Sequence, residues 1–186
     1  MANKTKNESK FSWDFFDIVE GVISVTVLLV IVVSLFFRMT VVQGESMEET
    51  LHDGEYLLVR DIFYTPERGD IVVVNDPSKS DFGGLYSEPL VKRVIAVAGD
   101  TLEIKTGVVF LNGRALEEDY INEHMRPESM APITIPENEI FVMGDNRNHS
   151  GDSRTFGTVD VRCVVGKAFF RVFPFNTISY LKSAEG

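Results

Sequence analysis

One long apolar run near the N-terminus constrains what this chain can fold into. The run is apolar from Gly21 to Phe37 and, taken from Ile18, is 20 residues long. A helix of that length measures about 30 Å at roughly 1.5 Å per residue, which matches the hydrocarbon core of a bilayer. The sequence therefore predicts a transmembrane anchor at residues 18–38. It separates a short segment at residues 1–17 from a domain at residues 39–186.

The residues that flank this run indicate an uncleaved anchor and its orientation. A cleaved signal peptide is the alternative, but the run ends Phe-Phe-Arg-Met, without a small-x-small cleavage site. Lys4, Lys6 and Lys10 precede the run, whereas Arg38 alone lies just after it. By the positive-inside rule, the N-terminus is cytoplasmic and residues 39–186 are extracytoplasmic. We therefore expect a single-pass protein of the cell membrane, with membrane lipid as one partner.

Charge and cysteine content exclude several classes of partner. The formal net charge is −10, and residues 1–38 contribute nothing to it because their four basic and four acidic side chains cancel. An acidic outer domain argues against nucleic acid as a partner and against charge-driven binding to anionic lipid. Cys163 is the single cysteine and lies in an apolar run, which predicts a buried, inert thiol. No Cys/His spacing indicates a metal site, and we expect no cofactor.

The region after the anchor is mainly β in pattern. Short β-branched or aromatic runs are separated by Gly, Pro and Asp, which is typical of strands. Asn112-Gly113 between two such runs predicts a tight hairpin turn. Residues 76–89 and 122–136 are polar or rich in Pro, Ser and Gly, and we expect loops or a small inserted lobe there. The runs that predict strands are 56–59, 71–74, 91–98, 102–104, 108–111, 140–143 and 164–172.

A polar loop with an unusual density of charge follows the strand at 140–143. Residues 144–157 interleave two Asp and two Arg with two Ser and three Gly. This mixture indicates a loop fixed by internal ion pairs and by bonds from side chains to the backbone. His149 beside Ser150 suggests a Ser-His-Asp triad. Sequence neighbours point apart in an extended chain, however, and triad members usually come from separate segments, so the triad is poorly supported.

Ser46 and Lys92 are better candidates for nucleophile and base. Ser46 follows the anchor directly, although a turn serine would look the same. Lys92 lies in an apolar strand, and burial can lower the pKa of a lysine by several units and so make it a base. Strand alternation puts Lys92 and Arg93 on opposite faces. The alternative for Lys92 is an edge-strand lysine that prevents aggregation.

Four segments together carry a resemblance to a known family. They read Gly-x-Ser-Met-x-x-Thr-Leu at 44–51, Gly-Asp-Ile-Val-Val-Val at 69–74, Val-Lys-Arg-Val-Ile-Ala-x-x-Gly-Asp at 91–100, and Val-Met-Gly-Asp-Asn-Arg-x-x-Ser-x-Asp-Ser-Arg-x-Phe-Gly at 142–157. In this order the chain resembles the bacterial type I signal peptidases, in their short form with one N-terminal anchor. The resemblance extends from the anchor to about Asn176 and implies a β-rich catalytic domain.

The resemblance also implies roles for individual residues. Ser46 would be the nucleophile, with its backbone N–H donating to the oxyanion, and Lys92 the general base. Ser150 would hydrogen-bond Lys92 and orient it. The supporting ion pairs would be Asp152 with Arg154 and Asp145 with Arg93. Shallow apolar pockets for the small side chains at substrate positions −1 and −3 would be lined by Val42, Met47, Leu51, Leu90 and Val91.

By the same resemblance, the activity would be cleavage of signal peptides from secretory preproteins after an Ala-x-Ala type sequence. The chain departs from the family at Glu49, where Pro is usual, and at Gly44, where some members place a hydroxyl as second oxyanion donor. These departures leave open a weak or inactive homologue that only binds signal peptides. A self-cleaving Ser/Lys repressor is disfavoured by the anchor, and a sortase-like enzyme would need a nucleophilic cysteine in another setting than that of Cys163.

Overall fold

The computed structural model describes residues 2–62, 64–75 and 89–184. The loop expected at 76–89 therefore lies outside the described residues except for its last position. By its internal contacts the chain divides into two compact units, Met1–Phe37 and Arg38–Gly186.

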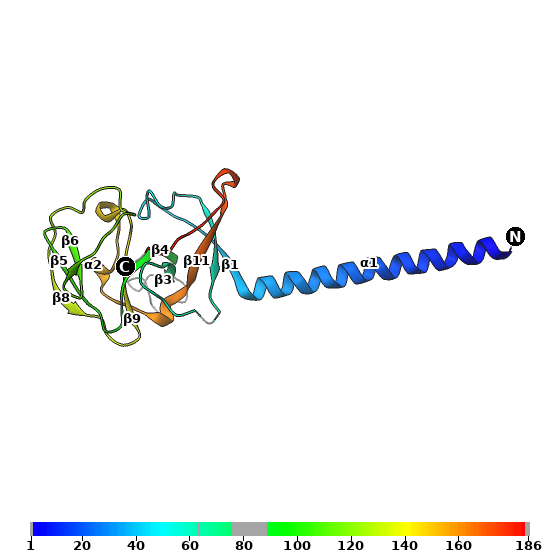
Figure 1. Cartoon of the computed structure of the whole chain (residues 1–186), viewed down its shortest axis with the longest axis horizontal. Coiled ribbons are helices and arrows are strands. Elements are labelled where there is room, and N and C mark those ends of the chain that lie inside the picture. The colour runs from blue at the N-terminus through cyan, green and yellow to red at the C-terminus, as the bar shows by residue number, and fades with distance from the viewer. Residues whose placement is uncertain (1, 63, 76–88, 185–186) are drawn as a thin grey trace. The chain divides into compact units, whose positions relative to one another are not determined.

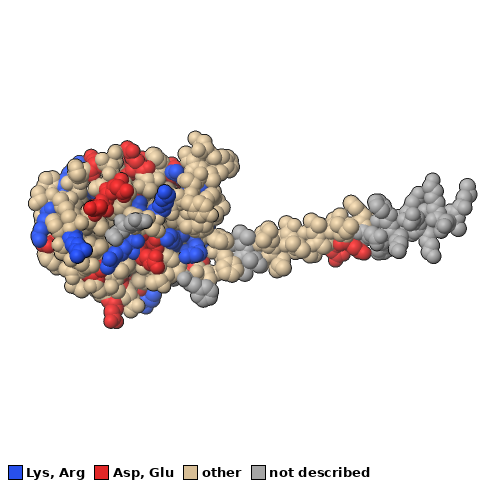
Figure 2. Space-filling view, viewed as in Figure 1, with Lys and Arg blue, Asp and Glu red and all other residues tan. Residues whose placement is uncertain are grey.

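The first unit is a single helix, α1, from Ala2 to Phe36. Figure 2 shows that its described surface is largely uncharged, whereas acidic and basic groups are intermixed over the visible face of the second unit. Among the described residues, no helix combines the length and the apolar character needed to cross a membrane. The anchor expected at 18–38 is not supported by this finding.

The second unit is mainly β, as the sequence predicts. The larger sheet has the strand order β1-β2-β11-β3-β4-β9-β10, with β12 paired to β11, and the smaller has the order β7-β6-β5-β8. In Figure 1, β5, β6 and β8 lie together, apart from β3, β4 and β11. The strands are β1 Phe37–Val41, β2 Tyr56–Arg60, β3 Ile71–Asn75, β4 Pro89–Val97, β5 Thr101–Lys105, β6 Val108–Leu111, β7 Arg114–Ala115, β8 Met130–Thr134, β9 Glu139–Met143, β10 Val159–Asp160, β11 Val164–Phe173 and β12 Ser179–Tyr180.

In the part of the second unit that the structure describes, helical structure is limited to single turns. These are the α-helical turn α2 at Ser153–Phe156 and the 3-10 turns η2 at Arg147–His149, η3 at Val161–Cys163 and η4 at Phe175–Thr177. Cys163 ends η3 and is partly exposed with a free thiol, so the expectation of a buried cysteine is wrong. Cys163 packs against the edge of an apolar cluster that contains Val72 and Val142, so it is half-buried and not enclosed.

The hairpin predicted at Asn112-Gly113 is confirmed, and one expected loop is a strand. Asn112 and Gly113 have φ values of 52° and 79° and join β6 to β7, as a two-residue hairpin turn requires. Strand β8 lies inside the expected loop 122–136 and pairs with β5. It contains Pro132 and is mostly exposed, because it is the edge strand of the smaller sheet, where proline is tolerated. Its sequence therefore lacks the apolar signal of an inner strand.

Strand β4 positions the functional residues. It lies between β3 and β9 in the larger sheet, with Lys92 opposite Val72 and Arg93 opposite Ile71. Six consecutive residues of β4, from Val91 to Ala96, are buried. A strand buried on both faces shields Lys92 and Arg93 alike from water, and each must find its partner inside the domain.

Candidate active site

Ser46 lies in a turn that is anchored by its apolar neighbours. Met47 and Leu51, on the C-terminal side of Ser46, are 1% and 0% exposed and belong to the cluster beneath the larger sheet. On the N-terminal side, Gly44 has a φ of 79°, which favours glycine, and its N–H donates to Asp53 Oδ1 at 2.7 Å. The side chain of Ser46 is thus held by a buried segment on one side and by a tethered glycine on the other.

Ser46 and Lys92 meet in space although 46 positions separate them. The Lys92 Nζ atom lies 2.6 Å from Ser46 Oγ and donates to the Val91 carbonyl at 3.1 Å. Lys92 is only 2% exposed. The sequence predicted Lys92 on a buried strand face, and the structure puts it there, beside the hydroxyl named as its partner.

Arg93 projects to the opposite side of β4 and binds Asp145. Its Nε and Nη2 donate to the two carboxylate oxygens at 2.8 and 2.7 Å, and its Nη1 donates to the Gly69 carbonyl at 2.8 Å. Thr50 Oγ1 adds a 2.6 Å bond to Asp145. Both charged groups are almost completely buried. The expected pairing of Asp145 with Arg93 is present, and it ties the 144–157 loop to β4 and to the Ser46 turn.

Asp152 and Arg154 form the second expected ion pair. Arg154 Nε and Nη2 each lie 2.8 Å from a carboxylate oxygen of Asp152, which also accepts the Gly144 N–H at 3.1 Å. Burial acts to raise the pKa of Asp152, but the Arg154 guanidinium and the Gly144 N–H outweigh burial and hold it below its ordinary value. The ionised carboxylate of Asp152 therefore holds Gly144, at the start of the 144–157 loop, close to Asp152 and Arg154 further along it.

The expected bond from Ser150 to Lys92 is not formed. Ser150 Oγ is buried and has no hydrogen-bond partner among the described residues. The contacts of Lys92 Nζ with Ser46 and the Val91 carbonyl are those given above, and Ser150 is packed against Gly144 instead. A β-carbon at Gly144 would lie within 3.0 Å of both Ser150 Oγ and the Ser46 carbonyl oxygen. Gly144 thus brings Ser150 close to the Ser46 backbone without a side chain between them.

A cleft of about 690 Å³ opens beside the Ser46–Lys92 pair. Leu90 lines it, together with Gly44, Glu45, His149 and Phe156 among others. The other expected pocket residues are packed in the buried cluster beneath the sheet, and their role in binding substrate stays a prediction; they are Val42, Met47, Leu51 and Val91. Phe156, which the sequence reasoning missed, supplies the second apolar wall, and its place at the end of the 142–157 motif was the available signal.

Two further contacts bind the 144–157 loop to the Ser46 turn. The Asn146 N–H donates to the Ser46 carbonyl at 3.1 Å, and Asn146 Nδ2 donates to the Glu45 carbonyl at 3.0 Å. The side chain of Arg147 turns inward, where it is fully buried against Glu118. Sequence reasoning gave no role to Asn146, Arg147 or Glu118. Glu118 lies outside every motif, so no sequence signal pointed to it.

The arrangement is suited to chemistry at a hydroxyl. Ser46 Oγ is polarised by a buried amine, and the Ser46 N–H has no acceptor among the described residues, so it is available to a developing negative charge. Within the described ranges, no group of three or more His, Cys, Asp or Glu side chains is placed to hold a metal ion.

A mainly β domain with a hydroxyl and an amine paired in a cleft has the features of a hydrolase that acts through an activated hydroxyl. Comparison with known proteins defines the family. The family model described as "Signal peptidase, peptidase S26" matches residues 15–173, and the chain belongs to this family.

Several known proteins that are similar to this chain are named as signal peptidases. Signal peptidase I of Bacillus licheniformis is 37% identical, with 93% of this chain and 94% of that protein covered. The probable signal peptidase I-1 of a Synechocystis strain is 36% identical, with 84% of each covered. A crystal structure of a signal peptidase I from Enterococcus faecalis, 31% identical, covers 56% of this chain and 97% of its own with a TM-score of 0.47.

Proposed function

We propose that this protein is a membrane-anchored serine endopeptidase that removes N-terminal signal peptides from secreted preproteins, cutting after small residues of the Ala-x-Ala type. The observation that carries the proposal is the 2.6 Å approach of Lys92 Nζ to Ser46 Oγ, with the lysine 2% exposed. Membership of the S26 family and relatives named signal peptidase I support the substrate class.

The proposed reaction runs through an acyl-enzyme. Neutral Lys92 takes the Ser46 hydroxyl proton as Oγ attacks the scissile carbonyl, and the Ser46 N–H donates to the resulting oxyanion. The tetrahedral intermediate collapses, and protonated Lys92 returns the proton to the leaving amine. Lys92 then takes a proton from a water molecule, whose oxygen attacks the ester carbonyl. The bond from the carbonyl carbon to Ser46 Oγ breaks, Lys92 returns the proton to Oγ, and the signal peptide is freed with a carboxyl end. Because the Gly44 N–H already donates to Asp53, it is not free to be the second oxyanion donor.

The remaining residues have supporting roles in this proposal. The Arg93–Asp145 and Asp152–Arg154 pairs hold β4, the Ser46 turn and the loop in one arrangement. Ser150 is the proposed orienting partner of Lys92 during proton transfer, since its hydroxyl is buried beside Gly144, which lies against the Ser46 carbonyl. Leu90 in the cleft is the expected contact for a small substrate side chain.

The apolar run from Ile18 to Phe37 supports the proposed anchoring. A single membrane span with a cytoplasmic N-terminus would hold the catalytic domain on the outer side of the membrane. An anchored enzyme meets substrates that emerge in the same plane at a high effective concentration. Signal peptides and membrane lipid are the partners that this placement implies.

The decisive test is cleavage of a secretory preprotein by the detergent-solubilised full chain, beside Ser46→Ala and Lys92→Met. We expect wild type to release the mature protein, both variants to lose activity by at least about 10³-fold, and both to keep the wild-type melting temperature. Activity should also fall as the pH is lowered, because Lys92 must be neutral to accept the proton.

Three results would count against the proposal. Folded wild type that binds the preprotein but leaves it intact would indicate the inactive homologue. Full activity of Lys92→Met would exclude Lys92 as base. An activity that does not vary from acid to alkaline pH would also exclude Lys92 as base.

A further inference from the structure

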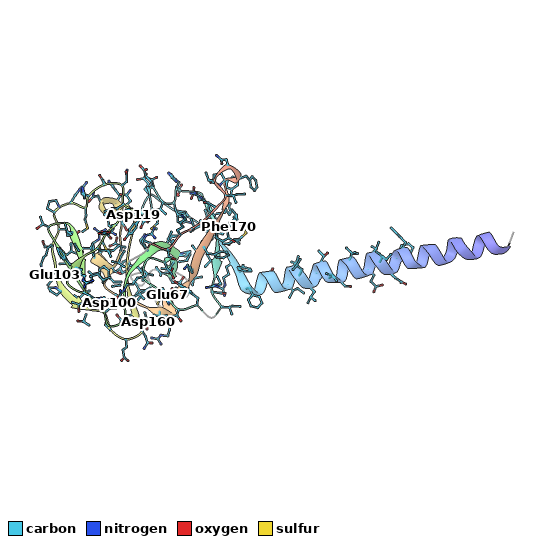
Figure 3. The ribbon with its side chains drawn as sticks, viewed as in Figure 1. Glu67, Asp100, Glu103, Asp119, Asp160 and Phe170 are labelled. Carbon is cyan, nitrogen blue, oxygen red and sulfur yellow. The ribbon has the colours of Figure 1, made fainter. Side chains whose placement is uncertain are left out.

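A segment of the chain outside the cleft, residues 116–125, contacts the 144–157 loop, which we call the catalytic loop. Residues 116–125 follow β7 in the smaller sheet, and Asp119 at their centre appears in the view of Figure 3 between Glu103 of β5 and Phe170 of β11. Glu118 accepts a hydrogen bond from Arg147 Nη1 at 2.8 Å and a second one from Arg147 Nη2. The Arg147 side chain is 0% exposed and that of Glu118 is 8% exposed. Glu118 is thus the counter-ion of a guanidinium that has no access to water.

Arg147 transmits this contact to the backbone of the loop. Its Nε donates to the Gly144 carbonyl at 3.1 Å, and its own carbonyl accepts a bond from Arg154 Nη2 at 2.7 Å. The Glu118–Arg147 pair therefore fixes both Gly144 and Arg147, the two ends of the segment that lies against Ser46.

Tyr120 connects the same segment to the second buried arginine. Its hydroxyl donates to Glu118 Oε1 at 2.8 Å, and its ring lies under the Arg93 guanidinium, 4.1 Å from the ring centroid. A cation over an aromatic face is attracted by the ring quadrupole, and more strongly so in a site without water. Arg93 in turn holds Asp145 through two bonds. Glu118 and Tyr120 together form what we call the 118–120 bridge.

The bridge reaches the reacting atoms through Gly144. This residue lies directly against the Ser46 carbonyl, and Asn146 donates to that carbonyl. A displacement of the Gly144–Arg147 segment therefore moves the Ser46 backbone, and with it the separation of Ser46 Oγ from Lys92 Nζ. Misplacement of a reacting group by about 1 Å can cost roughly 10²-fold in rate.

We propose that Glu118 and Tyr120 are positioning residues for the Ser46–Lys92 pair, acting through Arg147 and Arg93. Neither residue lines the cleft, so neither touches the substrate. The smaller sheet then has a mechanistic role, since the segment that leaves it holds the catalytic loop in place. This inference rests on the proposed function for its kinetic test, but the bridge itself can be tested without activity.

The experiment compares Glu118→Gln, Tyr120→Phe and Tyr120→Leu with a matched control, Glu117→Gln. Glu117 is exposed, adjacent in sequence, and makes no described ion pair. Preprotein cleavage gives kcat and KM for each variant of the full chain, melting temperature reports folding, and amide hydrogen exchange reports the mobility of residues 144–150.

Because the 118–120 bridge does not contact substrate, we expect the change in kcat rather than in KM. Glu118→Gln and Tyr120→Leu should lower kcat about 10- to 100-fold with KM within about threefold, and should speed exchange at 144–150. Tyr120→Phe keeps the ring under Arg93 and should retain more kcat than Tyr120→Leu. Glu117→Gln should match wild type.

Two results would overturn the inference. The first is a kcat within twofold of wild type in both Glu118→Gln and Tyr120→Leu, when both variants are folded. The second is a loss of kcat that is fully explained by a smaller fraction of folded protein, while Tyr120→Phe keeps the wild-type kcat. If wild type itself fails to cleave the preprotein, the proposed function is wrong. Amide hydrogen exchange at residues 144–150 then remains as the test of whether the 118–120 bridge holds this segment in place. Unchanged exchange in Glu118→Gln would contradict the bridge.

Discussion

Gly144 lies so close to the carbonyl of Ser46 that no side chain fits between them. A β-carbon at position 144 would fall within 3.0 Å of the Ser46 carbonyl oxygen and of Ser150 Oγ. This contact joins the turn that carries the hydroxyl to the loop that follows β9, two segments about 100 positions apart in the sequence. The geometry of the site depends on glycine here because of space, and not because of a positive φ.

Gly144→Ala should therefore impair the site directly. The added methyl group displaces either the Ser46 backbone or Ser150, and such overpacking typically costs about 1–3 kcal/mol of stability. We expect kcat for preprotein cleavage to fall at least about 10²-fold, because Ser46 Oγ moves relative to Lys92. Kinetics and thermal melting of the full chain measure both effects.

Gly151→Ala is the matched control for this prediction. Gly151 lies in the same loop and also lines the cleft, but a β-carbon there would meet nothing within 4 Å. It should keep near wild-type stability and kcat. Equal loss of activity in both variants would show that the loop is simply intolerant of substitution.

Ser150→Ala separates a structural from a catalytic role of the buried hydroxyl. Ser150 Oγ forms no well-aligned hydrogen bond, although it is close enough to the Asp152 carboxylate to help lower its pKa, and we expect its removal to change stability little. If the hydroxyl orients Lys92 during proton transfer, kcat should fall by about 10²-fold. His149→Ala, an exposed neighbour, should change little. Wild-type kcat in Ser150→Ala would exclude the orienting role.

The sequence was sufficient to predict the inner strands and the ion pairs between residues of the motifs. Runs such as Ile71–Val74 are continuous and apolar because β3 is buried on both faces, and such runs are read easily. The pairs Asp145–Arg93 and Asp152–Arg154 followed from the resemblance, because all four residues lie in its motifs.

The elements that the sequence did not reveal depend on tertiary contacts. Strand β8 is an exposed edge with a proline, so its own pattern is weak. Glu118 becomes important only because Arg147 turns inward toward it, and a glutamate in a polar stretch gives no sign of that. The Ser150–Lys92 bond was inferred from a motif, and a motif fixes neighbours in sequence but not the direction of a hydroxyl.

Asp145→Asn should be far more destabilising than the loss of a surface pair. Its carboxylate is 0% exposed and holds Arg93, so the substitution leaves a buried guanidinium without its counter-charge. Breaking a buried pair in this way typically costs about 3–5 kcal/mol. Glu103→Gln is the control, because its pair with Lys105 is at the surface and such pairs contribute about 0–1 kcal/mol. Urea unfolding of the full chain measures the difference, and equal free-energy changes would contradict the assigned burial.

The mainly β unit should lose stability in acid through its buried aspartates. Burial acts to raise the pKa of Asp70, but bonds from Lys167, Ser183 and Tyr64 hold it below the ordinary 3.8, and the pKa of Asp152 is lowered by Arg154 in the same way. A group whose pKa is lower in the folded state stabilises the fold fully above its unfolded pKa. That contribution disappears as the pH falls from about 3.8 toward the folded-state value.

Asp70→Asn tests this pH dependence in the full chain. The variant should be less stable than wild type at neutral pH, where Asp70 is ionised and bound to Lys167 at 2.5 Å. The difference in stability between the two should narrow as the pH falls below about 3.8, since the carboxylate is then protonated in unfolded wild type while it is still ionised in the fold, and this proton uptake favours unfolding. Glu137→Gln, an exposed substitution, should follow the wild-type curve throughout. If the difference in unfolding free energy between Asp70→Asn and wild type stayed constant into acid, Asp70 would act through packing and not through its charge.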